Sequence, residues 1–285
     1  MANKEIQHYI YSFFENVDAL FQDYLTYNQS LCDLKDLDFQ NNHFPAYNNQ
    51  GIQCLYLMRY FYAYFTEYYC LYCDFLDKLE TTPRVASVGC GNGVDGAALF
   101  FAARGVPFQY CGFDAVKWIP CATDFLSGNF QYFTVNIVEA KLFANNILIF
   151  PKSLTDFAEE DFYAFISNLT DASFENRVMI LSSIMAEGTQ YDVQRMSVVI
   201  NKMVQLGFKL VDGNLNDVYR IVGQEACCRL IDAGYPDPMR DFMQTLKTHC
   251  IDSNSECESC GIDRLPVLKT KNARFQYFLL ERRSL

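Results

Sequence analysis

A glycine-rich turn offers the clearest chemistry in this chain. Gly89-Cys90-Gly91-Asn92-Gly93 follows the short apolar run 84–88 and precedes a helical pattern over 94–103. Glycines in a turn from strand to helix let a ligand approach the backbone, and the helix start presents free N–H groups to it. Asp95 suits that helix start, because a carboxylate favours the positive end of the helix dipole. The segment predicts a cofactor-binding site.

A carboxylate follows the next strand at an informative distance. Asp114 ends the run 109–113, about twenty residues beyond the glycines, where a carboxylate can accept hydrogen bonds from both hydroxyls of a ribose. Ala115 comes directly after it, and Trp118 lies close enough behind for its ring to stack on a purine. The spacing indicates a cofactor that contains a nucleoside.

Together, the glycine turn and the later Gly112-Phe113-Asp114 resemble the cofactor signature of class I S-adenosylmethionine-dependent methyltransferases. The resemblance covers about residues 84–212 and the final strand. It implies that the glycine loop contacts the methionine part of the cofactor, that Asp114 holds the ribose, and that Asn136 and Ile137 flank the adenine. Ser87 stands where the family often has an acid. Asp95 or the N-terminal segment is therefore expected to contact the methionine amino group instead.

The end of the fourth predicted strand is where the resemblance places residues that face the methyl acceptor. Pro151 is expected at the cofactor, and Lys152 and Ser153 are candidate catalytic residues because they can orient or polarise an acceptor. The alternative is a solvated Lys152 and a Ser153 that caps the following helix. The Asn/Asp-Pro-Pro-aromatic motif of members that methylate DNA or protein amides is absent, which disfavours those acceptors. Methyl transfer needs mainly alignment and desolvation, so no acid–base pair is required.

Other functions stay open. Gly91-Asn92-Gly93-Val94-Asp95-Gly96 also fits G-x-G-x-x-G, which is typical of dinucleotide-binding proteins, so an NAD-dependent oxidoreductase is one alternative. Gly89, the long leader and the lack of a second substrate domain favour the methyltransferase. A catalytically silent, methyltransferase-like binding protein is the other alternative, and the glycine turn can also be purely structural.

The elements that position these residues alternate along the chain. Strands followed by helices predict an α/β fold with a doubly wound, mostly parallel seven-stranded sheet, and the resemblance implies an antiparallel last strand. Residues 1–80 are expected to form an N-terminal helical cap or lid, and 81–285 a Rossmann-like domain with an irregular, Cys-rich insert at about 213–272. Strands are expected at 84–88, 109–113, 129–135, 146–150, 178–184, 208–211 and 274–281, and helices at 4–27, 51–79, 94–103, 161–169 and 191–206.

The insert carries a candidate zinc site. Cys257 and Cys260 have the two-residue gap that lets both thiolates reach one zinc ion, and Cys250 is a candidate third ligand. The fourth ligand is His249, Cys227 or Cys228. A zinc ion would stabilise an insert that is too irregular to form a core of its own. The alternative is a solvated loop.

Charge and composition limit the partners. The net charge is −11 and the pI is near 4.7, which disfavours nucleic acid, so the expected acceptor is a small molecule or a protein. The most apolar early stretch, 55–76, is interrupted by charged residues, which argues against a membrane span. Twelve cysteines without a signal-peptide pattern indicate free thiols or metal ligands in a cytoplasmic protein. The sequence leaves the acceptor, the activity and the oligomeric state open.

Overall fold

A single mixed β-sheet forms the centre of the computed structural model, which describes residues 2–28, 31, 34, 47–184, 189–221, 235–249, 266–267 and 273–282. Its strands run in the order β3-β2-β1-β4-β5-β8-β6, and the short β7 pairs with β8. The strands are β1 (Arg84–Val88), β2 (Gln109–Asp114), β3 (Phe130–Thr134), β4 (Asn145–Pro151), β5 (Phe174–Ile184), β6 (Phe208–Asp212), β7 (Tyr219–Ile221) and β8 (Ala273–Arg282).

The strand directions confirm the predicted fold class. Strands β1 to β5 pair in parallel, whereas β8 runs antiparallel to both β5 and β6. The strand order reverses direction between β1 and β4, so the carboxyl ends of these two strands flank the place where open α/β sheets bind ligands. The short strand β7, which spans only Tyr219–Ile221, was not predicted from the sequence.

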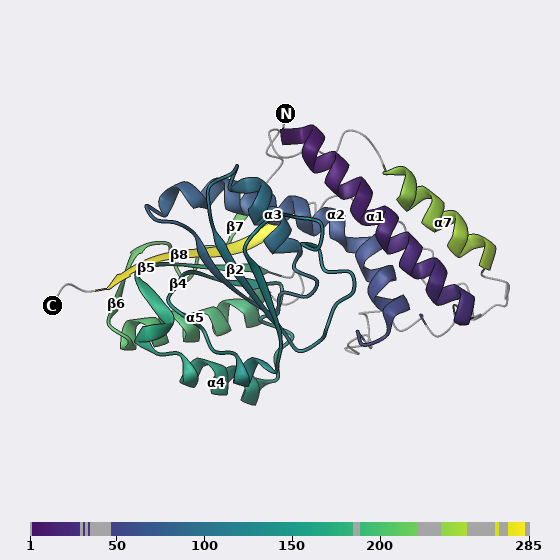
Figure 1. Cartoon of the computed structure of the whole chain (residues 1–285). Helices are drawn as coiled ribbons and strands as arrows, with labels where there is room; N and C mark the ends of the chain where they lie inside the picture. The colour runs from purple at the N-terminus through teal and green to yellow at the C-terminus, as the bar shows by residue number, and fades with distance from the viewer. Residues whose placement is uncertain are drawn as a thin grey trace.

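Helices cover both faces of the sheet (Figure 1). On one face α2 and α3 share a core with inward side chains of β1 and β4, and on the other face α4 and α5 share a second core. Outside α2 lies α1, and α7 packs on α1. The helices are α1 (Ala2–Tyr27), α2 (Gln50–Phe75), α3 (Val94–Ala102), α4 (Glu159–Asn168), α5 (Thr189–Gln205) and α7 (Asp237–His249), with 3₁₀ helices η3 (Leu76–Lys78), η4 (Ile137–Glu139) and η5 (Asp171–Ser173).

The N-terminal helices belong to the same hydrophobic core as the sheet. Phe13 of α1 stacks on Phe61 of α2 with ring centroids 4.1 Å apart, and both lie in one cluster with Val85 and Ile147 of the sheet. Buried side chains occur all round α2, because α1 covers one side of it and α3 with the sheet covers the other. The expected division at residue 80 stays a prediction.

The insert contains a helix that the sequence analysis did not anticipate. Within 213–272, which was expected to be irregular, α7 forms an amphipathic helix over Asp237–His249. Met239, Phe242 and Leu246 are buried, and the Phe242 ring lies 4.6 Å from that of Phe21 in α1. The apolar spacing and a proline in the first turn are both helix signals, and both were present in the sequence.

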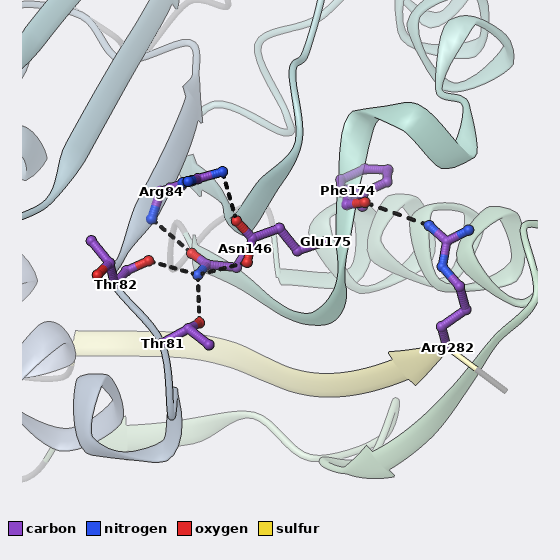
Figure 2. A network of polar contacts seen from close by, with 7 residues as sticks. All are labelled: Thr81, Thr82, Arg84, Asn146, Phe174, Glu175 and Arg282. Carbon is purple, nitrogen blue, oxygen red and sulfur yellow. Dashed lines mark hydrogen bonds and ion pairs between the residues drawn. The ribbon is translucent and has the colours of Figure 1, made fainter. Parts of the chain in front are cut away.

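A buried amide fixes the amino ends of the central strands (Figure 2). Asn146 is fully buried, and its Oδ1 accepts the backbone N–H of Arg84 at 2.7 Å. Its Nδ2 donates to Thr81 Oγ1 at 2.9 Å and to the Thr82 carbonyl at 2.8 Å. Glu175 completes the network with an ion pair to Arg84 at 3.1 Å. These contacts set the register of β1 beside β4 at the amino ends of the strands, whereas the glycine turn lies at their carboxyl ends.

None of the described helices combines the length and the apolar composition needed to cross a membrane.

Candidate cofactor and acceptor site

The glycine turn after β1 is tight at both ends and open in the middle. Gly89, Gly91 and Gly93 have φ values of +72°, +55° and +76°, which side chains rarely adopt. A Cβ at Gly89 would lie 2.3 Å from Ser153 Cβ, and one at Gly93 would lie 2.2 Å from the Tyr132 hydroxyl. At Gly91 the nearest atoms belong to the Trp118 ring at 3.8 Å, an ordinary contact distance. A side chain would therefore clash at both ends of the loop, whereas Gly91 at its centre is partly exposed and has room beside it.

Asp114 reaches this centre of the loop. The N–H of Gly91 donates to Asp114 Oδ2 at 2.7 Å, and the N–H of Val116 donates to Oδ1 at 2.9 Å. Burial raises the pKa of Asp114, while these two bonds oppose that rise. Each carboxylate oxygen can accept a further hydrogen bond. The structure thus brings the glycine loop and the carboxylate together, as the sequence predicts.

Several buried polar atoms around the loop have no hydrogen-bond partner in the described part of the chain. Asn92 Nδ2 lies in the loop itself, and Trp118 Nε1 lies beside Gly91 and near Asp114 without completing a hydrogen bond to it. Ser87 Oγ and Asp95 Oδ2 are fully buried next to each other at the start of α3. An unsatisfied buried polar group costs about 1–3 kcal/mol, so such atoms are usually satisfied by water or a ligand. Their concentration here fits a site for a polar ligand.

Asp95 is enclosed under the start of its helix. The Tyr110 hydroxyl of β2 donates to Oδ1 at 2.8 Å, and the Asp95 side chain is fully buried. Burial raises the pKa of Asp95 to about 6, although Ser87 and Tyr110 oppose the rise. The Ser87 hydroxyl lies beside the carboxylate without completing a hydrogen bond. Asp95 therefore brings a carboxylate next to residue 87, where the resemblance expects an acid.

Trp118 is held in place by the N-terminal helices. Gln53 of α2 is buried, donates to the Lys117 carbonyl at 2.9 Å and accepts the Ile119 N–H at 3.0 Å. The Trp118 ring then packs against Tyr47 and Tyr56, with centroids 5.1 Å and 5.4 Å away. No sequence motif marks Gln53, because its role depends on contacts between distant segments.

The remaining predicted cofactor residues lie around this edge in different environments. Cys90 is buried in the loop, and burial raises the pKa of its thiol well above the ordinary value, which keeps it protonated. Ala115 is exposed next to Asp114. Beyond the end of β3, Asn136 is exposed and accepts the Val138 N–H at 3.0 Å, while Ile137 is buried. Their role beside an adenine stays a prediction.

Lys152 follows β4 in a constrained conformation. Its φ is +55°, which is uncommon for a residue other than glycine. Its Nζ lies 2.9 Å from Glu67 Oε1, and the two side chains are 12% and 2% exposed. The hydroxyl of Ser183, at the end of β5, donates to the same Glu67 oxygen. Lys152 is therefore enclosed and paired, unlike the solvated lysine of the alternative interpretation.

Ser153 supports the glycine loop. Its hydroxyl donates to the Val88 carbonyl at 2.6 Å, and its Cβ occupies the space beside Gly89. It is buried and makes no side-chain cap for α4, which starts at Glu159. Pro151, the last residue of β4, pairs with Ser183 of β5.

Asp156 is a further carboxylate at this edge, and the sequence analysis missed it. Burial raises its pKa to about 7; Thr155 and Arg195 oppose the rise, and the charge of Asp114 adds to it. The residue as a whole is exposed, so solvent screens part of this effect. No sequence motif marks Asp156, because only the fold brings it near Asp114.

The zinc prediction falls largely outside the described residues. Cys250, Cys257 and Cys260 lie there, as do Cys227 and Cys228, and for His249 only the backbone at the end of α7 is described. Among the described residues no cluster of His, Cys, Asp and Glu could hold a metal ion.

One cavity of about 840 Å³ lies at the opposite edge of the sheet. Thr82, Gln109 and Asn129 line it at the amino ends of β1, β2 and β3, with Phe100 and Phe108 among its apolar neighbours. This cavity is therefore separate from the glycine loop and the Lys152 pair.

Comparison with known proteins finds only distant likenesses. No family model and no curated relative matches the chain. One similar solved structure is 1,6-didemethyltoxoflavin-N1-methyltransferase of Burkholderia thailandensis, at 9% identity over 78% of this chain and 80% of that chain, with a TM-score of 0.41. Another is the methyltransferase domain of a bacterial CtHen1, at 11% identity over 78% of this chain and 100% of that chain, with a TM-score of 0.44.

A TehB-like S-adenosylmethionine-dependent methyltransferase from Corynebacterium glutamicum is 10% identical over 74% of this chain and 87% of that chain, with a TM-score of 0.39. These structures are all methyltransferases.

Proposed function

We propose that this protein binds S-adenosylmethionine at the glycine loop and Asp114, and transfers its methyl group to a small molecule or a protein. The observation that carries the proposal is the bond from Gly91 N–H to Asp114 Oδ2 at 2.7 Å, at the one glycine of the loop where a Cβ would meet no clash. The unsatisfied N–H donors of Asn92 and Trp118 beside it fit a ligand that carries hydrogen-bond acceptors.

Each residue of the site has a defined task in this proposal. Asp114 accepts the ribose hydroxyls, Gly91 lets the ligand approach the backbone, and Trp118 covers the site from the side of α2. The bound cofactor supplies an activated methyl group on a sulfonium, so the protein need only align and desolvate the reactants. The proposed location is the cytoplasm, on the composition alone.

Calorimetric titration with S-adenosylhomocysteine, S-adenosylmethionine and NAD in parallel tests the cofactor. Micromolar binding of the first two, worth about −8 kcal/mol, supports the proposal. An Asp114→Ala variant should lose that binding. Binding of NAD alone would instead support an oxidoreductase, and binding of none would leave the glycine turn a structural feature.

Transfer itself needs a separate experiment. The protein is incubated with a cell extract and S-adenosylmethionine that carries a labelled methyl group. Incorporation of label that depends on the protein supports an enzyme. Tight cofactor binding without incorporation would favour the catalytically silent binding protein.

A further inference from the structure

We propose that the methyl acceptor presents an acidic hydroxyl or a carboxyl oxygen, which binds as an oxyanion to the ammonium of Lys152, and that Glu67 positions this ammonium. The inference rests on the proposed function and deepens it. It concerns the carboxyl ends of β4 and β5, where Lys152 and Ser183 meet Glu67 of α2.

The backbone of Lys152 is held in a strained conformation. A residue with a side chain at φ +55° is uncommon, and such strain is typically kept where the surrounding structure imposes it. The residues on both sides are fixed, because Pro151 pairs with β5 and Ser153 bonds to the Val88 carbonyl. This arrangement directs the Lys152 side chain toward α2 rather than into solvent.

The Lys152 ammonium has donor capacity to spare. Of its three N–H donors, one faces Glu67 Oε1 at 2.9 Å, and the Tyr64 ring lies 5.0 Å from Nζ. In the described part of the chain these are its only partners. At 12% exposure the side chain is largely desolvated yet still accessible. A desolvated ammonium with a free N–H favours an oxyanion and repels a cationic amine.

Glu67 serves to fix the ammonium rather than to bind a ligand. Its side chain is 2% exposed, and Oε1 accepts from both Lys152 and Ser183. A carboxylate so enclosed is shielded from an incoming acceptor. Its position on α2 also means that the N-terminal helices set the geometry on the acceptor side.

An amine acceptor would need a different group, and among the described residues at this end of the sheet the candidate is Asp156, a carboxylate near Asp114. Asp156 is an exposed residue, whereas the Lys152 side chain is enclosed and its ammonium is held by Glu67 and the Tyr64 ring of α2. The Lys152 ammonium is thus fixed better than the Asp156 carboxylate. We therefore favour an oxyanion acceptor over an amine.

The reaction that follows is balanced without a protein base. The acceptor gives its proton to solvent on binding, and the resulting oxyanion is held by the Lys152 N–H. An electron pair of that oxygen forms the bond to the methyl carbon, while the carbon–sulfur bond breaks and its pair stays on sulfur.

The test uses 4-nitrophenol, whose ionised form absorbs visible light. The whole protein is first saturated with S-adenosylhomocysteine, and calorimetry confirms that complex. 4-Nitrophenol is then added at a pH where it is half ionised, and the ionised band is recorded. We expect the band to rise on binding. Lys152→Met should weaken binding at least tenfold and remove the rise, Lys152→Arg should keep it, and benzylamine should not bind.

Further variants separate positioning from general structural damage. Glu67→Ala should lose the spectral rise, whereas Glu67→Gln should keep it because the amide oxygen can still accept a hydrogen bond from the Lys152 ammonium. Lys78→Met is the matched control, since Lys78 forms an exposed ion pair with Asp212 at 3.0 Å and lies over two rings. If Lys152→Met does not fold, Lys152→Gln replaces it.

The outcomes distinguish this inference from the proposed function. No binding of S-adenosylhomocysteine would overturn the proposed function itself. Binding of S-adenosylhomocysteine together with a preference for benzylamine, lost in Asp156→Asn, would overturn the oxyanion acceptor alone. An unchanged spectral rise in both Lys152→Met and Lys152→Gln would do the same.

Discussion

The backbone N–H of Gly91 donates to Asp114 Oδ2 at 2.7 Å across 23 residues of sequence. This bond joins the turn after β1 to the carboxylate that ends β2. Asp114 therefore shapes the loop and still has acceptor positions for a ligand. Any change at Asp114 therefore affects both the conformation of the loop and the binding of a ligand.

Asp114→Asn should weaken S-adenosylhomocysteine binding about 10- to 100-fold, because hydrogen bonds to a charged group contribute about 1.5–3 kcal/mol. The amide oxygen can still accept one of the two N–H bonds, so the fold should persist. Calorimetry measures the affinity. Asp124→Asn is the matched control, since Asp124 also accepts a loop N–H, from Cys121 at 3.0 Å. Equal losses in both variants would contradict a ligand role for Asp114.

Gly91→Ala should abolish cofactor binding while it lowers stability only modestly. Its Cβ would meet only the Trp118 ring at 3.8 Å, so the penalty to the fold comes from the left-handed φ, about 1 kcal/mol. Gly105→Ala shares that strain at φ +85° with nothing within 4 Å, and should bind normally. Thermal unfolding and calorimetry give both quantities. Normal binding by Gly91→Ala would mean that no ligand approaches the loop there.

Asp95→Asn should gain stability relative to the wild type as the pH rises. The folded protein keeps the Asp95 proton up to a pKa of about 6 instead of the ordinary 3.8, so wild-type stability falls as the pH rises through that window. The difference between these two pKa values corresponds to roughly 3 kcal/mol of wild-type stability. The Asp95→Asn variant keeps that stability, because its amide does not titrate in this range. Denaturant unfolding from about pH 4 to about pH 7 measures it.

Tyr110→Phe is the companion variant. It removes the donor to Asp95 Oδ1, so the charged carboxylate loses a hydrogen bond and the pKa of Asp95 should rise further. The pH range over which stability falls should then extend to higher pH. A stability difference between Asp95→Asn and wild type that is flat with pH would show that Asp95 does not titrate in this range.

Trp118 is the only tryptophan in the chain, so its fluorescence reports directly on the site. Binding of S-adenosylhomocysteine should change the emission, since the ring lies beside Gly91. Gln53→Leu should shift the emission of the free protein and weaken binding, because it leaves the Lys117 carbonyl and the Ile119 N–H without their partner. Gln22→Leu, on α1, is the control. Emission that does not respond to the ligand would place the site elsewhere.

The cysteine spacing in the insert predicts bound zinc. Elemental analysis of the purified protein should find about one zinc ion per chain, since the candidate set is one four-ligand site. Substitution of Cys257 and Cys260 by Ser should remove it. A metal-free protein would end the hypothesis.

Local patterns predicted most of the elements that build the site. The periodicity over 4–27 and 51–79 matches α1 and α2 closely, and the turn 89–93 lies between β1 and α3 as expected. Among the described strands and α-helices, β7 and α7 were not predicted. A three-residue strand exists only through its pairing with β8, which no local pattern reveals. The apolar positions of α7 were visible, but the surrounding Gly and Pro residues outweighed them.

The sequence by itself determined the sheet, the glycine turn and the carboxylate after β2, because these depend on local conformation and on strand order. Only the tertiary structure decided which groups meet. It enclosed Asp95 beside Ser87, gave Trp118 its support from Gln53, and paired Lys152 with Glu67 across 85 residues. Such pairings arise from helix packing over the sheet, so burial, charge and hydrogen bonding at the site depend on segments that no local pattern connects.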